Sequence, residues 1–207
     1  MTGYRPVNLM KQNLYNNYPL KIKVGEKYYD IDPDFRLMMN FELCAQKEDK
    51  QGIAEIITKF YQYILPVDIN AAIHEMISFY LCGETNNDNS DGDDSQKKRC
   101  YAYDEDWKYI TAAFRQQYGI DLVNSDMHWY EFSALFSGLT EETEFIKILQ
   151  YRCTDLKKIK NSEEKNRIRR LQKRYALSEN KVKHFSSTAE RDADMINNLR
   201  NNLLKRK

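Results

Sequence analysis

Apolar residues recur at helical spacing through most of this chain, and this spacing constrains the fold more than any other feature. The clearest run occupies positions i, i+3, i+4, i+7, i+8 and i+11, namely Ile53, Ile56, Ile57, Phe60, Tyr61 and Ile64. A period near 3.6 residues predicts an amphipathic helix. We expect Pro66 to stop this helix, Asp68 to cap the next one, and Gly83 to stand at the end of that second helix.

Similar stripes predict helices on both sides of this pair. Asp32-Pro33-Asp34 should open the first helix, with a capping carboxylate and a proline whose missing N–H costs nothing at a helix start. Four or five more helices are expected after residue 100. Their markers are Trp107 to Tyr118 closed by Gly119, Trp129 to Phe136 closed by Gly138, Thr140 to Leu149, Asn161 to Tyr175, and a thin C-terminal stripe after Ser187.

One segment near the N-terminus has the alternation of a β-hairpin. Leu20 to Val24 alternates apolar and polar residues, Gly25-Glu26 follows, and Tyr29 and Ile31 resume the alternation. Glycine at the first position of a two-residue loop suits a type II′ turn. Glycine (7) and proline (4) are otherwise scarce in the 207 residues, which disfavours a many-stranded sheet. The predicted fold is mainly α: a multi-helix bundle with a small N-terminal β-hairpin.

The chain is expected to have three parts. Residues 1–19 are a polar N-terminal arm, and residues 20–177 are a helical domain with the hairpin at 20–32. Within that domain, residues 84–95 contain no apolar side chain and predict a mobile acidic loop. Residues 178–207 form a polar C-terminal tail or helix, on which Ile196, Leu199 and Leu203 share one side and could contact a partner.

The formal net charge of +1 conceals a difference between the two halves of the chain. Residues 1–106 carry 12 Lys and Arg against 18 Asp and Glu, and residues 107–207 carry 20 against 13. Such polarity can orient partners or self-association. We find no secretion signal and no apolar stretch long enough for a transmembrane span, so we expect a protein that remains in the cytoplasm where it is made.

No residue pattern points to catalysis, a cofactor or a metal. There is no glycine-rich phosphate loop, no G-x-S-x-G and no H-E-x-x-H. The four cysteines are far apart and are expected to be reduced, buried thiols. Acid pairs such as Asp104/Asp106 and Glu141/Glu142 suit helix starts. His128 lies beside Trp129, where a structural role is favoured over a general base.

The strongest electrostatic feature is a basic run between residues 157 and 175, with nine Lys and Arg and two acids. Arg167, Arg170, Lys173 and Arg174 are the residues that we expect to contact a partner. These cations could follow nucleic-acid phosphates. Because no aromatic interleaving or nucleic-acid motif accompanies them, a solvated helix face or a contact with an acidic protein is the favoured interpretation, and nucleic acid is not the expected partner.

Several strings resemble a protein family of tailed bacteriophages that is known by its gene-product number, fifteen. They are Tyr29–Arg36, Phe79–Gly83, Tyr109–Leu122, His128-Trp129, Phe136–Leu139, Tyr151-Arg152 and Asp155-Leu156, in that order. The resemblance extends over about residues 20–177. Tyr130, Glu131 and Cys153-Thr154 depart from its pattern.

This resemblance implies a long-tailed phage of a Gram-positive host, a gene between those of the major tail and tape-measure proteins, and no active site. The implied role is that of a tail assembly chaperone, which binds the tape-measure protein, the tail-tube protein or both in the host cytoplasm. A homo-oligomer is a further expectation, since the charge polarity of the chain can orient self-association. The alternatives are a structural tail protein retained in the virion, and a phage protein that binds nucleic acid or a host factor.

Overall fold

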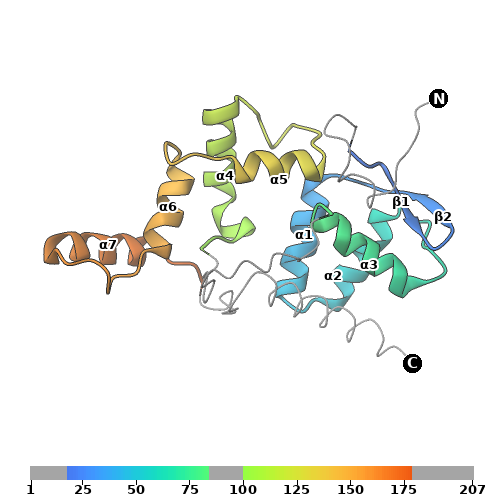
Figure 1. Cartoon of the computed structure of the whole chain (residues 1–207), viewed down its shortest axis with the longest axis horizontal. Helices are drawn as coiled ribbons and strands as arrows, with labels where there is room; N and C mark the ends of the chain where they lie inside the picture. The colour runs from blue at the N-terminus through green and yellow to red at the C-terminus, as the bar shows by residue number, and fades with distance from the viewer. Residues whose placement is uncertain (1–17, 84–99, 179–207) are drawn as a thin grey trace. The chain divides into compact units, whose positions relative to one another are not determined.

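The computed structural model describes residues 18–83 and 100–178 (Figure 1). Within these ranges the chain forms seven helices and one two-stranded antiparallel sheet. The predicted mainly helical fold with a small N-terminal hairpin is therefore confirmed. The described residues divide into two compact units: unit 1 contains residues 18–83 and 126–134, and unit 2 contains residues 100–125 and 135–178.

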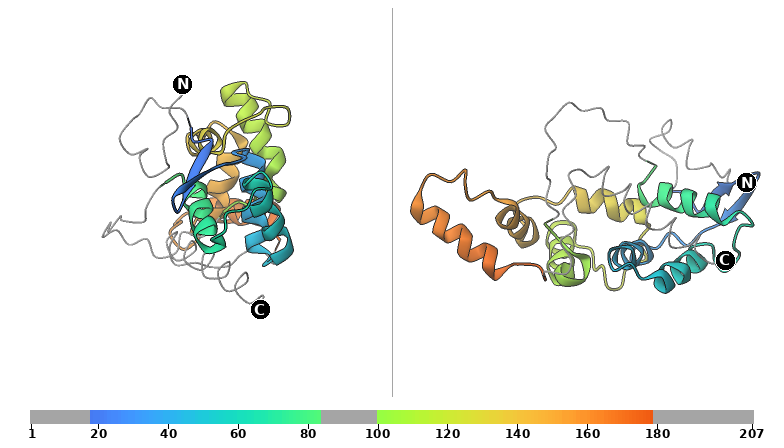
Figure 2. Two further views of the ribbon diagram at one scale, coloured as in Figure 1. Left: turned by 90° about the vertical axis from the view of Figure 1, so that its right-hand side faces the viewer. Right: turned by 90° about the horizontal axis from the view of Figure 1, so that it is seen from below.

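Unit 1 begins with the hairpin, formed by β1 (Lys21–Val24) and β2 (Lys27–Asp30). Lys21 pairs with Asp30 and Val24 with Lys27 in the antiparallel register. Gly25 has a φ of 60°, the left-handed value that the first position of a type II′ turn requires. The two inward residues of β1 are buried, and the hairpin lies beside α3 in Figures 1 and 2.

The first helix, α1 (Phe35–Gln46), begins at a carboxylate cap. Asp34 is the N-cap, and its Oδ1 accepts a hydrogen bond from the Arg36 N–H at 2.8 Å. Pro33 lies before the cap, so the expectation that this proline occupies the helix start is wrong. Its carbonyl instead accepts a hydrogen bond from the Trp129 N–H at 2.8 Å, which is a long-range contact that local sequence does not show.

Two further helices, α2 (Lys50–Phe60) and α3 (Ile69–Tyr80), contribute many of the buried residues of unit 1. Asp68 caps α3 as predicted, because its Oδ1 accepts from the Ala71 N–H at 3.0 Å. The placement of Ile64 on the preceding helix is wrong. Gln62 and Tyr63 have φ values of 46° and 66°, and these left-handed residues end α2 before Pro66 is reached.

The chain returns to unit 1 at residue 126 and begins α5 (Trp129–Ser137) there. The Phe35 N–H donates to the Met127 carbonyl at 3.2 Å. The Trp129 indole N–H donates to the Tyr80 carbonyl at 2.8 Å, and the Phe132 ring stacks on Phe35 with 4.9 Å between centroids. These contacts place Trp129 and Phe132 of α5 in the core of unit 1.

Unit 2 is built from α4 (Tyr103–Tyr118), α6 (Glu144–Cys153) and α7 (Ser162–Arg174). Gly119 ends α4 with a φ of 69°, as predicted. The helix expected from Thr140 begins later, because residues 140–143 form a turn and Thr143 is the cap. Asn161 caps α7, since its Oδ1 accepts from the backbone N–H groups of Glu163 and Glu164. Figure 2 shows α7 beside α6.

The core of unit 2 is apolar and comes from α4, α6 and the segment after α4. Its most buried members are Ile110, Phe114, Leu122, Phe145 and Ile148. Three predicted features lie outside the described residues: most of the N-terminal arm, the acidic loop at 84–95, and the C-terminal stripe of Ile196, Leu199 and Leu203 with its expected cap Ser187.

Candidate functional site

The predicted partner-binding cations lie on α7, and all four are exposed to solvent. Arg167 is paired with a carboxylate: its Nε and one terminal nitrogen donate to the two oxygens of Glu164 at 2.9 and 2.8 Å. Hydrogen bonding to Arg167 lowers the pKa of Glu164. The charge of Arg167 is therefore largely compensated within the helix.

The other three predicted cations lie on the side of α7 that faces away from its buried residue, Ile168. Arg170 donates only to the Asn166 carbonyl, at 3.4 Å, and the Arg174 guanidinium lies 5.5 Å from the centre of the Tyr175 ring. Neither of these residues nor Lys173 forms an ion pair within residues 18–83 and 100–178. This side of α7 can contact an acidic surface. Exposed cations on one helix face do not distinguish one acidic partner from another.

A second candidate surface is the segment between α2 and α3, residues 62–69, which we call the apolar connection. It exposes large apolar side chains in succession: Tyr63 is 74% exposed, Ile64 71% and Val67 96%. Leu65 and Ile69 are also exposed, while Pro66 between them is buried. Contiguous exposed apolar side chains of this kind are typical of protein-binding surfaces.

The apolar connection is held by hydrogen bonds at its N-terminal end. The Tyr63 N–H donates to the Thr58 carbonyl at 2.8 Å, and the Ile64 N–H donates to the Tyr61 carbonyl at 2.9 Å. The Gln62 side-chain amide donates to the Ile31 carbonyl at 2.9 Å, which joins the connection to the end of the hairpin. The exposed side chains therefore project from a backbone whose path is determined by unit 1.

Sequence reasoning missed this surface because it assigned Ile64 to the buried side of a helix. One signal was present in the sequence. Large apolar residues continue past the helix end at every second position, Tyr63, Leu65, Val67 and Ile69, with Ile64 beside them. This spacing does not continue the helical stripe, so the face that buries the preceding helix cannot bury them all.

Unit 2 contains a buried ion pair that local sequence patterns did not reveal. Arg152 near the end of α6 forms a two-pronged contact with Asp106 in the first turns of α4, at 2.7 and 2.9 Å. The exposed fractions of the two side chains are 8% and 1%. Asp106 also accepts from the Ala102 N–H at 3.0 Å. The helix-dipole interpretation of this acid was incomplete, because its main partner lies 46 residues away.

The same guanidinium connects two further segments of unit 2. Arg152 donates to the carbonyl of Cys100 at 2.8 Å and to the carbonyl of Tyr175. Gln172 on α7 adds donors to the carbonyls of Tyr151 and Thr154, at 3.0 and 2.8 Å. We call the set of contacts made by Arg152 the Arg152 clasp. It joins α4, α6 and the end of α7.

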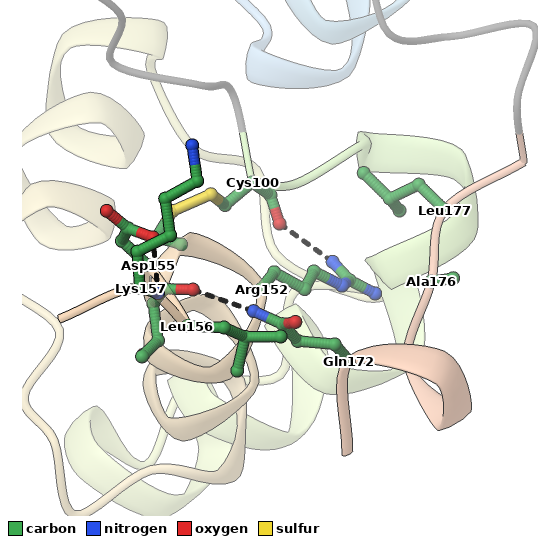
Figure 3. A pocket seen from close by; sticks show the side chains of 10 residues that line it. Cys100, Arg152, Asp155, Leu156, Lys157, Gln172, Ala176 and Leu177 are labelled. Carbon is green, nitrogen blue, oxygen red and sulfur yellow. Dashed lines mark hydrogen bonds between the residues drawn. A yellow bond between two sulfur atoms is a disulfide. The ribbon is translucent and has the colours of Figure 1, made fainter. Parts of the chain in front are cut away.

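Cys100 and Cys153 are joined by a disulfide directly beside the Arg152 clasp (Figure 3). The prediction of four reduced thiols is therefore wrong for this pair, whereas Cys44 and Cys82 are not part of a disulfide. The two residues are 53 positions apart in sequence, and the packing of α4 on α6 brings their Cα atoms to 5.9 Å. Spacing along the chain could not show that proximity.

A pocket of about 470 Å³ opens beside the disulfide. It is lined by both disulfide cysteines and by side chains of the α6–α7 segment, among them Arg152, Asp155, Lys157 and Gln172 (Figure 3). A volume of 300–1,000 Å³ is typical of small-molecule pockets. The lining combines a disulfide with an anionic and a cationic side chain, Asp155 and Lys157, so the pocket can bind a charged small molecule next to a reactive sulfur.

His128 has a structural environment in unit 1. Its Nδ1 accepts from the Tyr130 N–H at 3.0 Å, and its Nε2 lies 3.0 Å from the Pro19 carbonyl, to which it donates as the neutral ring. Burial lowers the pKa of His128, with partial compensation by the Pro19 carbonyl. Because both nitrogens contact backbone groups, neither is available to take a proton from a bound substrate.

Among the described residues, no group of three or more His, Cys, Asp or Glu side chains has a geometry that could hold a metal ion. None of the helices α1 to α7 is long and apolar enough to cross a membrane.

The fold and its surfaces define a mainly helical protein made of two compact units, with an exposed apolar connection in one and a basic helix in the other. Comparison with protein families matches residues 14–177 to the family described as Bacteriophage Gp15 protein. This match covers most of the chain, so the chain belongs to that family and is a bacteriophage protein. Comparison with curated proteins found no match, and neither did comparison with solved structures.

Proposed function

We propose that this protein is a phage tail assembly chaperone, which binds the tape-measure protein, the tail-tube protein or both in the host cytoplasm, and acts by stoichiometric binding without turnover. Family membership supports a phage role, and the gene position implied for this family supports a role in tail assembly. A tape-measure protein is a long helix whose apolar side would aggregate if it remained in water.

The observation that carries this proposal is the apolar connection. Tyr63, Ile64 and Val67 expose apolar surface that unit 1 does not use for its own core. An amphipathic helix binds to such a surface through its apolar side chains, in the way that helices bind to apolar grooves elsewhere. The occupant that we propose is the apolar side of a tape-measure helix.

The hydrogen bonds that order the backbone of the apolar connection favour binding. Ordering a loop or side chain at an interface costs free energy that is subtracted from affinity. Here Gln62 is anchored to Ile31 and the Asp68 cap orders the far end of the connection. The left-handed φ values of Gln62 and Tyr63 are of the kind that the surrounding structure retains at functional segments.

Coexpression with the tape-measure protein of the same phage tests the proposal. The full chain should keep that partner in the soluble fraction, and the double variant Ile64→Asp/Val67→Asp should lose most of this effect because two charges would have to be buried at the contact. Val123→Asp is the matched control, since Val123 is also exposed, at 59%, but belongs to unit 2.

Three results distinguish the possibilities. Precipitation of the partner with the wild-type chain rejects the chaperone role. Equal solubilisation by wild type and by the double variant places the contact elsewhere on the protein. Mass spectrometry of purified virions should find the chain absent or scarce, and one copy per tail ring would instead support a structural tail protein.

A further inference from the structure

The Cys100–Cys153 disulfide and the pocket beside it form a site that the proposed chaperone role does not use. We propose that this pocket binds a small zwitterionic thiol of peptide size, and that this thiol opens the disulfide by attacking Cys153. The inference stands independently of the chaperone role, because it depends on groups of unit 2 alone.

Burial distinguishes the two sulfur-bearing residues. Cys153 is the last residue of α6 and is exposed, whereas Cys100 is 5% exposed. Thiol–disulfide exchange requires an attacking thiolate to approach one sulfur in line with the bond, so accessibility decides which sulfur is attacked. Both cysteines line the pocket, and the exposed one receives the incoming group.

The exchange balances in two steps. The thiolate of the small thiol forms a bond to the sulfur of Cys153 while the bond between the two protein sulfurs breaks, and Cys100 leaves as a thiolate. A second molecule of the same thiol then attacks the mixed disulfide. The products are the oxidised small-molecule disulfide and the two protein thiols, so the small thiol supplies both electrons.

The charges of the pocket indicate what kind of thiol fits. Lys157 carries an exposed ammonium group, and no carboxylate among the described residues pairs with it. Asp155 supplies the opposite charge; one of its carboxylate oxygens accepts from the Lys157 N–H at 2.8 Å. The Arg152 guanidinium is committed to Asp106. One cation and one anion beside a sulfur complement a thiol that carries both a carboxylate and an ammonium group.

The size of the pocket agrees with that ligand. A volume of about 470 Å³ is larger than a two-carbon thiol needs and falls in the range of pockets for small organic molecules. Gln172 contributes an amide whose nitrogen donates to two backbone carbonyls of this segment. This arrangement holds the α7 wall of the pocket beside the residues that carry the charges.

Opening the disulfide leaves unit 2 folded, because the Arg152 clasp joins the same segments. Arg152 holds the Cys100 carbonyl and the Asp106 carboxylate, which both belong to the α4 side, and it is the neighbour of Cys153 in sequence. The disulfide is thus a second connection between α4 and α6. Because the clasp remains when the sulfur–sulfur bond is broken, the disulfide can open without separating these segments.

The test uses the full chain, purified without reductant, and reduced glutathione as the probe. Intact mass should show one disulfide, and peptide mapping after acid quenching should place the glutathione adduct on Cys153. Cys44 and Cys82 are internal controls because neither is part of a disulfide and both are partly buried. Circular dichroism should show the helical signal retained throughout the exchange.

Two variants separate recognition from simple reactivity. Lys157→Ala and Asp155→Asn should each slow the reaction with glutathione severalfold and leave the reaction with 2-mercaptoethanol unchanged, because the latter thiol has no charged groups to bind. Asparagine retains the oxygen that accepts from the Lys157 N–H. Free thiols at both cysteines in oxidised protein, an adduct on Cys100, or equal slowing for both probes would overturn the proposal.

Discussion

The His128 ring is held at both nitrogens by backbone groups of unit 1. The Tyr130 N–H donates to Nδ1, and Nε2 donates to the Pro19 carbonyl. Tyr18 stacks on the ring with 4.8 Å between centroids. Protonation would add a second N–H at Nδ1, where the Tyr130 N–H already points. At the scale of the single residue, the neutral ring is therefore part of the folded structure.

Acidification should destabilise the protein through His128. The unfolded ring has a pKa of about 6.5, and burial lowers the pKa of the folded ring below that value. Between the two values the unfolded chain binds the proton and the folded chain does not. The contribution of the neutral ring is complete above about pH 6.5 and is lost as the pH falls toward the folded pKa.

Urea unfolding at about pH 7.5 and about pH 5.5 checks this prediction. His128→Gln should lose less stability on acidification than wild type, because glutamine does not titrate. His74→Gln is the control: the His74 side chain is 80% exposed, so this variant should follow wild type. If wild type and His128→Gln lose equal stability on acidification, His128 does not contribute to the pH dependence of stability.

Two buried tyrosine hydroxyls should respond oppositely to removal. The Tyr130 hydroxyl has no hydrogen-bond partner among the described residues, so Tyr130→Phe should leave the free energy of unfolding unchanged or raise it by up to about 1 kcal/mol. The Tyr80 hydroxyl donates to the buried Glu42 carboxylate at 2.7 Å. Tyr80→Phe should cost about 1–3 kcal/mol, since the carboxylate loses a donor.

Chemical denaturation of the two variants beside wild type measures both effects. The prediction concerns their difference, because both changes remove one oxygen from a residue that is less than 10% exposed in unit 1. A loss for Tyr130→Phe as large as that for Tyr80→Phe would mean that the Tyr130 hydroxyl has a bonded partner, such as a buried water molecule.

At the scale of elements, the helices of unit 2 are joined by two kinds of connection at one place. The Arg152 clasp links α6 to α4 and to the end of α7 through hydrogen bonds, and the disulfide links residues next to α4 and α6 covalently. The aromatic and aliphatic core supplies most of the burial, while these two connections specify which helix ends meet. Such end contacts depend on side chains far apart in sequence.

Replacing Arg152 by methionine should strongly destabilise unit 2. The change leaves the Asp106 carboxylate buried, with the Ala102 N–H as its one remaining hydrogen-bond donor among the described residues. Breaking one member of a buried ion pair typically costs about 3–5 kcal/mol. Thermal or urea unfolding with the disulfide intact measures this loss.

The matched control is Arg167→Met on α7, which removes an exposed arginine from its pair with Glu164. Exposed pairs contribute at most about 1 kcal/mol, so this variant should remain close to wild type. Similar small losses for both variants would show that the clasp is not a main source of stability in unit 2.

At the scale of the whole molecule, the two units are not two halves of the sequence. Residues 126–134 follow the first part of unit 2 but belong to unit 1, where Trp129 bonds to Tyr80 and Phe132 stacks on Phe35. The aromatic stripe at 129–136 predicts a helix from its spacing alone. Its spacing does not show which core accepts the aromatic rings, because any apolar interior of suitable size offers the same gain.

Local physical chemistry determined much of the element pattern. The apolar period of α2, the caps Asp68 and Asn161, the left-handed Gly119 and the hairpin around Gly25 all follow from interactions within a few residues. Caps and turns have nearly the same free energy wherever the segment lies in the molecule, whereas an apolar stripe gains its free energy only by packing against a core. The family resemblance also came from short strings of residues. The family comparison confirmed it with a match over residues 14–177.

The tertiary structure alone decided the surfaces and the chemistry. From the sequence we predicted that Ile64 belongs to a helix, that Cys100 and Cys153 are separate thiols, and that Asp106 interacts with a helix dipole. In the structure Ile64 is exposed on the apolar connection, the two cysteines are bonded, and Asp106 pairs with Arg152. Cys100 and Asp106 have partners 53 and 46 residues away, and Ile64 has no segment of the described chain packed over it. Interactions between neighbouring residues do not determine any of these outcomes.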